Sequence, residues 1–168
     1  MELPKRKNIR LNGYDYSQNG AYFLTVCTDN REHLLSEVVV GQGLCSCRLT
    51  DIDTLIECEI KKIPERFSNV CIEKYVIMPN HIHMIVVLKQ RQEQSPCPTN
   101  PTIDGIICAY KSITTKLCNV TDNMPGRKIW QFRYHDHIVR SDDDYQKIWQ
   151  YIDENPAKWT ADKYYTVD

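Results

Sequence analysis

Residues 75–88 read YVIMPNHIHMIVVL, and this stretch predicts the centre of a β-sheet. Residues 71–78 and 81–89 are rich in apolar and β-branched side chains, and Pro79-Asn80 interrupts them. Apolar runs on either side of a turn signal predict two successive strands.

Two histidines open the second of these strands. Side chains alternate between the faces of a strand, so His81 and His83 should point the same way, about 6.5–7 Å apart along the strand, with Ile82 on the other face. Imidazoles at that spacing can share one metal ion. The alternative is a pair of histidines that only pack or form hydrogen bonds at the start of a strand.

The flanking sequence completes an α+β pattern. Further strands are expected at 21–28, within 35–49 as a hairpin, and at 130–140. Helices are expected over 49–67, where Thr50 and Asp53 form a capping signal, over about 101–118, and after the Ser141 cap. This order predicts a central antiparallel sheet with helices packed on one face, ferredoxin-like in architecture. The length of 168 residues fits one domain, 1–168, with 141–168 as a C-terminal helical appendage.

Composition excludes some classes of protein and leaves nucleic-acid binding open. No apolar run approaches the ~20 residues of a membrane span, and the N-terminal residues lack the apolar region of a secretory signal, so we expect a cytoplasmic protein. The net charge is −1. Basic residues nevertheless predominate in 1–10 and in 105–140. Such clustering favours an anionic partner, although an unevenly charged solvated surface would look the same.

A second histidine pair lies on the expected strand at 130–140. His135 and His137 should share a face with Arg133 and Val139. If this strand lies beside the first pair, four imidazoles could converge. Zinc or another transition metal would suit such a cluster better than magnesium.

The helix at 101–118 carries one tyrosine on its apolar stripe. Tyr110 falls in register with Ile103, Ile106, Ile107 and Ile113, a spacing typical of a core residue. The pKa of a phenol is about 10, so a nucleophilic role for Tyr110 would require a metal or a base nearby.

Four sequence blocks resemble the IS200-like tyrosine transposases, and most closely the REP-associated members. They are YFLTVCTDNREHLL at 22–35, YVIMPNHIHMIVVL at 75–88, IWQFRYHDHIVR at 129–140 and YIDENPAKW at 151–159. The resemblance runs in order from about residue 21 to residue 160. It implies the HUH nuclease superfamily, in which two histidines flank a bulky hydrophobic residue, as His81, Ile82 and His83 do.

The resemblance also implies a mechanism. A tyrosine on a nearby helix attacks a phosphate of single-stranded or hairpin DNA, leaving a 5′-phosphotyrosine link and a free 3′-hydroxyl before the DNA is rejoined. We predict Tyr110 as the nucleophile, and His81, His83 and His137 as ligands of Mg²⁺ or Mn²⁺. The usual family helix has a glutamine four residues after the tyrosine, where this chain has Thr114, and another register places Thr114 itself at the nucleophile position. Tyr134 is a further candidate nucleophile, and His135 and Gln131 are further candidate ligands.

A basic groove lined by aromatic rings suits single-stranded DNA. The residues predicted to form it are Lys111, Arg127, Lys128, Trp130, Arg133 and Tyr134. Two other functions stay open: a DNA-hairpin-binding relative that no longer cuts, favoured by Thr114, and a hydrolase with four histidines on a metal. A homodimer and a monomer are both compatible with the sequence.

Overall fold

The computed structural model describes residues 14–41, 44–48, 51–90 and 101–166, and its elements follow the order expected from sequence. The strands are β1 (Gly20–Cys27), β2 (Glu37–Gly41), β3 (Leu44–Arg48), β4 (Val70–Met78), β5 (His81–Leu88) and β6 (His135–Val139). The helices are α1 (Asp51–Lys61), α2 (Ile63–Arg66), α3 (Ile103–Thr121) and α4 (Asp142–Glu154), with 3₁₀ turns η1 (Asp29–Arg31) and η2 (Pro156–Ala161). Thr50 and the basic residues of 1–10 lie outside the described residues.

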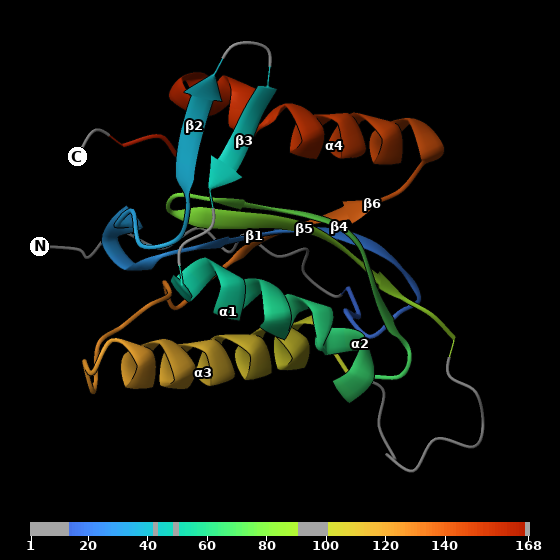
Figure 1. Ribbon diagram of the computed structural model, residues 1–168. Helices are drawn as coiled ribbons and strands as arrows, with labels where there is room; N and C mark the ends of the chain where they lie inside the picture. Colours follow the sequence, from blue (N-terminus) through green and yellow to red (C-terminus); the bar gives the residue numbers. More distant parts are fainter. Residues whose placement is uncertain (1–13, 42–43, 49–50, 91–100, 167–168) are drawn as a thin grey trace, which may run out of the picture.

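The central sheet has the order β4-β5-β1-β6, and every neighbouring pair in it is antiparallel. Strands β4 and β5 are joined directly through Pro79-Asn80, as predicted, and their pairing reaches back to Met78 opposite His81. Strands β2 and β3 form a separate hairpin at one end of the molecule (Figure 1). The expected α+β class with a central antiparallel sheet is therefore confirmed.

Helices cover both faces of the sheet, and not one face as the sequence led us to expect. Figure 1 shows α1 and α3 on one side of the sheet and α4 on the other. On the first side, Ile82 and Met84 of β5 join a large buried cluster with residues of α1 and α3. On the second side, Ile85 packs with Ile148 and Ile152 of α4. An amphipathic pattern shows which side of a helix is apolar, but it does not show which face of the sheet that side covers.

Helix α4 forms as its sequence predicts. The Ser141 hydroxyl accepts a hydrogen bond from the backbone N–H of Asp144, and three aspartates occupy the first turn, where the helix dipole favours negative charge. Ile148 and Ile152 are buried, with Tyr145 and Trp149 packed beside them. Residues 141–166 thus cover one face of the sheet.

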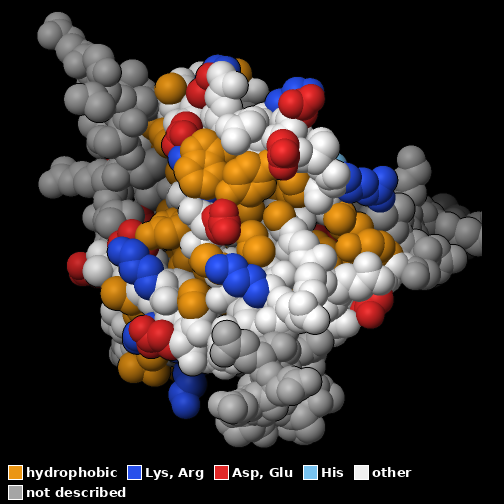
Figure 2. All heavy atoms as spheres, turned by 90° about the vertical axis from the view of Figure 1, so that its right-hand side faces the viewer, with side chains coloured by type: hydrophobic (Ala, Val, Ile, Leu, Met, Phe, Trp, Pro, Cys, Tyr) orange, Lys and Arg blue, Asp and Glu red, His pale blue; other side chains and the backbone are white. Residues whose placement is uncertain are grey.

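The surface carries mixed charge. Seen from the right-hand side of Figure 1, the described residues show hydrophobic, basic and acidic side chains close together, with no broad patch of one sign (Figure 2). This agrees with the net charge of −1. Among the described residues, no helix combines the length and the hydrophobicity that a bilayer span requires.

Candidate active site and metal centre

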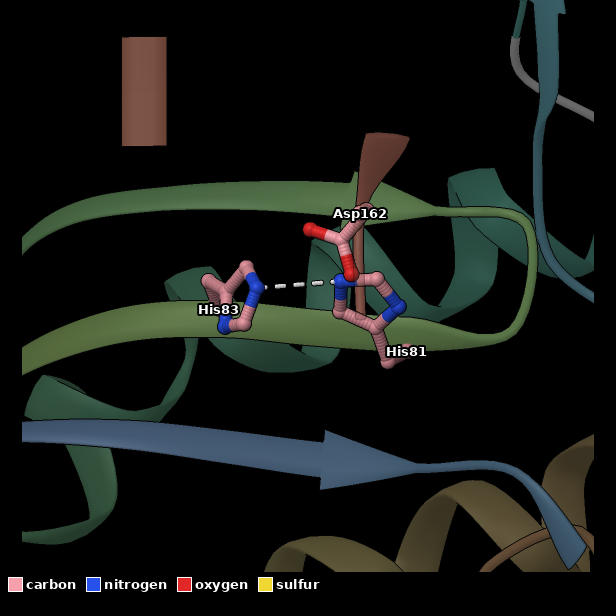
Figure 3. Close-up of side chains that lie close together, drawn as sticks. All are labelled: His81, His83 and Asp162. Atoms are coloured by element: carbon pink, nitrogen blue, oxygen red, sulfur yellow. Dashed lines mark hydrogen bonds between the residues drawn. The ribbon is translucent and has the colours of Figure 1, made fainter. Parts of the chain in front are cut away.

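His81 and His83 lie at the start of β5 and face the α4 side of the sheet. Both side chains are fully buried, and their Nε2 atoms are 3.0 Å apart (Figure 3). The prediction that the two imidazoles share one face of the strand is confirmed. Two nitrogen ligands of one ion, each about 2.1 Å from it, have about this separation.

The other ring nitrogen of each histidine has a fixed partner. His83 Nδ1 lies 2.9 Å from Thr25 Oγ1, and His81 Nδ1 lies 2.9 Å from Asn80 Oδ1. Asn80 also donates a hydrogen bond from Nδ2 to the carbonyl oxygen of Tyr164, 2.9 Å away. Such contacts orient metal-binding imidazoles and set their tautomers. Asn80, which the sequence marked only as a turn residue, is thus part of the site.

Asp162 approaches the histidines from the segment after η2. One ligand atom from each of His81, His83 and Asp162 can be chosen so that all three lie within 4.8 Å of one another (Figure 3). Asp162 Oδ1 accepts a hydrogen bond from the backbone N–H of Tyr164, and Oδ2 accepts one from Asn155 Nδ2. Two imidazoles and a carboxylate form a donor set that suits a divalent metal ion, and these residues fit one.

Tyr151 of α4 brings its hydroxyl to this group. Its hydroxyl oxygen Oη lies 3.3 Å from His83 Nε2 and donates a hydrogen bond to Asp162 Oδ2 over 3.1 Å. The side chain is 37% exposed, so the phenol remains open to a ligand. Burial raises the pKa of Tyr151, and the Asp162 carboxylate raises it further. The phenol is therefore neutral at pH 7 in this environment.

Tyr110, the predicted nucleophile, lies on the opposite face of the sheet from the histidines. It is 1% exposed and packs in the α1–α3 cluster with Ile82 and Met84, the residues that alternate with the histidines along β5. Burial raises its pKa well above 10. Thr114, the other position considered on α3, is fully buried and accepts a hydrogen bond from Trp130 Nε1. Helix α3 therefore brings neither position to the metal centre.

The second histidine pair does not join the first. Strand β6 pairs with β1 and not with β5, so Thr25 stands between His83 and His135. Two strand spacings, about 9.5 Å, separate the two pairs. His137, the predicted third ligand, is 55% exposed and lies 2.8 Å from Asp144. Asp162 occupies the place expected for His137, and no cluster of four imidazoles forms among the described residues.

The remaining candidates from sequence, Tyr134 and Gln131, have other partners. Tyr134 donates its hydroxyl hydrogen to Asp104 of α3. The backbone N–H of Gln131 bonds to the carbonyl of Cys27, and its carbonyl accepts from Lys111.

Burial keeps both metal-centre histidines neutral. It lowers the pKa of His81 and of His83, and the nearby Lys163 ammonium lowers both further. A neutral imidazole has a lone pair available for a metal ion. Both histidines can therefore bind a metal ion at neutral pH without first losing a proton.

The predicted DNA-binding residues fall mostly around another hollow. A cleft of about 850 Å³ lies between α3 and residues 130–136. The predicted residues that line it are Lys111, Trp130, Arg133 and Tyr134. Arg127 instead forms an ion pair with Asp122, and Lys128 is exposed outside the cleft.

A smaller pocket that the sequence did not reveal adjoins the histidines. It measures about 420 Å³ and its lining includes Arg31, Lys163 and Tyr164. The Tyr164 ring packs 4.7 Å from the His81 ring, and both cations lie over it, Arg31 at 5.4 Å and Lys163 at 4.8 Å. Asn30 and Arg31 have φ of 49° and 60°, in the left-handed region, which residues other than glycine adopt only uncommonly, Asn more often than most.

Comparison with known proteins agrees with this architecture. The structure of a REP-associated tyrosine transposase bound to a REP hairpin superposes with a TM-score of 0.63, at 24% sequence identity, over 92% of this chain and 76% of that chain. The chain thus has the fold of that class, which confirms the fold that the resemblance implied. No protein-family model matches the chain. An uncharacterized protein of Haemophilus influenzae is 31% identical over 173 residues, covering 95% of this chain and 93% of that protein. This chain belongs to the same family as that protein.

Proposed function

We propose that this protein is a metal-dependent tyrosine transposase that cleaves and rejoins single-stranded DNA next to a hairpin, with Tyr151 as the nucleophile. The observation that carries the proposal is the position of the Tyr151 hydroxyl, 3.3 Å from His83 Nε2 and 3.1 Å from Asp162 Oδ2. The fold shared with a transposase that binds a REP hairpin supports DNA as the substrate.

The proposed reaction exchanges one ester bond for another. The Tyr151 oxygen attacks the scissile phosphorus and forms the tyrosine O–P bond as the P–O3′ bond breaks. The phenol proton passes to Asp162 Oδ2, the acceptor that it already faces, and the 3′ oxygen takes up a proton from solvent water and leaves as a hydroxyl. The bond energy is kept in the phosphotyrosine link, so the reverse attack by a 3′-hydroxyl rejoins the strand.

His81, His83 and Asp162 would hold the metal ion, which we propose to be Mn²⁺ or Mg²⁺. A bound divalent ion supplies charge stabilisation to a phosphate undergoing displacement. Thr25 and Asn80 keep the two imidazoles in orientation for that purpose. Arg31 and Lys163 add positive charge in the adjoining pocket, where the DNA backbone next to the scissile phosphate would lie.

The test is to trap the covalent intermediate. Incubating the protein with hairpin DNA that carries a single-stranded flank, in the presence of Mn²⁺, should give a protein–DNA adduct that survives denaturing gel electrophoresis. Tyr151→Phe should abolish the adduct, because the nucleophilic oxygen is removed. Chelation of the metal ion should abolish it as well.

Tyr110→Phe is the matched control, because it removes a hydroxyl from a buried tyrosine on the other face of the sheet. This variant should form the adduct at the wild-type level. An adduct that persists in Tyr151→Phe and disappears in Tyr110→Phe would refute the assignment. Binding of the hairpin DNA without any adduct, under all metal conditions, would support a binding protein without catalysis.

A further inference from the structure

The segment 131–133 exposes the aromatic ring of Phe132 to solvent. The Phe132 side chain is 96% exposed, the highest exposure among the large hydrophobic side chains that the structure describes as exposed. Leaving a phenyl ring in water forgoes the stabilisation that its burial would contribute. Phe132 stands at the rim of the 850 Å³ cleft between α3 and residues 130–136.

Lys111 holds this segment in place from α3. Its Nζ donates hydrogen bonds to the carbonyl oxygens of Gln131 at 2.8 Å, of Arg133 at 3.1 Å and of Phe132 at 3.5 Å. The same ammonium lies 5.6 Å from the centre of the Tyr134 ring. Its three donors are thus directed at backbone acceptors. Burial also lowers the pKa of Lys111 to about 8.

The cleft itself combines apolar walls with positive charge. Ile107, Cys108 and Trp130 contribute apolar lining, and Lys116 and Arg133 line the cleft together with Lys111. Two acids, Asp104 and Asp136, also line it. Asp104 accepts a hydrogen bond from the Tyr134 hydroxyl. An exposed ring beside cations is the arrangement that binds unpaired bases by stacking while the backbone phosphates stay near positive charge.

The cleft lies on the α3 side of the sheet and shares one lining residue with the smaller pocket. Asp136 lines both this cleft and the smaller pocket beside the histidines, so the two hollows flank β6, the edge strand of the sheet. A single strand leaving the metal centre through the smaller pocket would reach Phe132 after crossing β6. This path favours a DNA strand over an apolar protein segment as the occupant.

We propose that Phe132 is a stacking platform for an unpaired base of the DNA strand, and that Lys111 is a positioning residue that fixes this platform and does not contact phosphate. The proposal rests on the proposed function for the identity of the ligand. It replaces the role in direct DNA contact that the sequence indicated for Lys111.

The test uses fluorescence anisotropy with two hairpin oligonucleotides, one with a normal single-stranded flank and one whose flank is abasic but keeps its phosphates. Wild-type protein should bind the normal flank about tenfold more tightly than the abasic flank. Phe132→Ala should bind both flanks equally, at the weaker level, and Phe132→Tyr should restore the difference. Because Phe132 is exposed, its replacement leaves the core intact.

Salt dependence distinguishes a positioning role of Lys111 from a direct contact with phosphate. Lys111→Met should lose the discrimination between the flanks with little change in the slope of log affinity against log salt, and Phe132→Ala added to it should have no further effect. A slope reduced by about 1, with discrimination kept, would instead identify a phosphate contact and overturn the role given to Lys111. Lys147→Met, an exposed lysine on α4, is the matched control.

Equal binding of both flanks by wild-type protein, or no measurable binding, would overturn the proposal for Phe132. Equal binding of both flanks would leave the covalent chemistry standing, which the Tyr151 adduct tests separately, whereas no measurable binding would count against the proposed function as well.

Discussion

Individual side chains around the two histidines carry out separate tasks. Thr25 and Asn80 contact the two imidazoles, and Asp162 adds a carboxylate to the group that could hold a metal ion. Tyr151 supplies the hydroxyl that the proposed chemistry requires. These residues come from β1, the β4–β5 turn, α4 and the C-terminal segment, so the site depends on contacts between distant parts of the chain.

At this scale we predict that Thr25→Val weakens metal binding without unfolding the protein. The substitution keeps the shape of the side chain but removes the hydroxyl that contacts His83 Nδ1. Loss of such an orienting contact typically costs about 10–100-fold in metal affinity. Isothermal titration with Mn²⁺ measures the effect, and Thr121→Val, at the exposed end of α3, serves as the control. Equal affinities of the two variants would show that Thr25 does not orient the histidine.

At the scale of elements, two helices that resemble each other locally lie on opposite faces of the sheet. Both α3 and α4 begin at a hydroxyl cap, Thr102 accepting from Gly105 N and Ser141 from Asp144 N. Both carry a tyrosine near a buried stripe. Of the two helices, only α4 lies on the face of the sheet that holds the histidines, and of its two tyrosines Tyr151 places its hydroxyl beside them.

The two caps give a matched prediction. Ser141→Ala and Thr102→Ala should each lower the free energy of unfolding by about 1 kcal/mol, measured by urea denaturation. Ser141→Ala should also slow formation of the covalent DNA adduct, because it loosens the helix that carries Tyr151. Thr102→Ala should leave the rate of adduct formation unchanged. A slower reaction in Thr102→Ala alone would indicate that α3, and not α4, carries the nucleophile.

At the scale of the whole molecule, buried neutral histidines make stability depend on pH. Burial lowers the pKa of His81 and His83 in the folded protein, whereas in the unfolded chain both titrate near 6.5. Below about pH 6.5 the unfolded state therefore binds more protons than the folded state. The free energy of unfolding should fall as the pH drops from there toward the lowered folded-state values.

Urea denaturation in the presence of a chelator, at pH 7.5 and at pH 5, measures this effect. Wild-type protein should lose more stability between the two pH values than a variant with His81→Gln and His83→Gln, in which these groups cannot titrate. An equal loss in both proteins would show that the histidines are protonated in the folded state as readily as in the unfolded chain.

The sequence by itself determined the features that depend on neighbouring residues. The alternation of side chains along a strand placed His81 and His83 on one face, and the capping and amphipathic patterns located α3 and α4. The blocks that carry the family resemblance also include Tyr151, within YIDENPAKW, although periodicity gave no reason to prefer it over Tyr110.

Only the tertiary structure decided which helix faces the histidines and which carboxylate joins them. A helical pattern looks the same whichever face of the sheet the helix covers, so Tyr110 and Tyr151 could not be told apart by spacing. The order of strands likewise placed β1 between the two histidine pairs. His137 therefore contacts Asp144 and not the first pair. Asp162 is separated from His83 by most of the C-terminal half of the chain, and they meet because α4 and η2 fold back across the sheet.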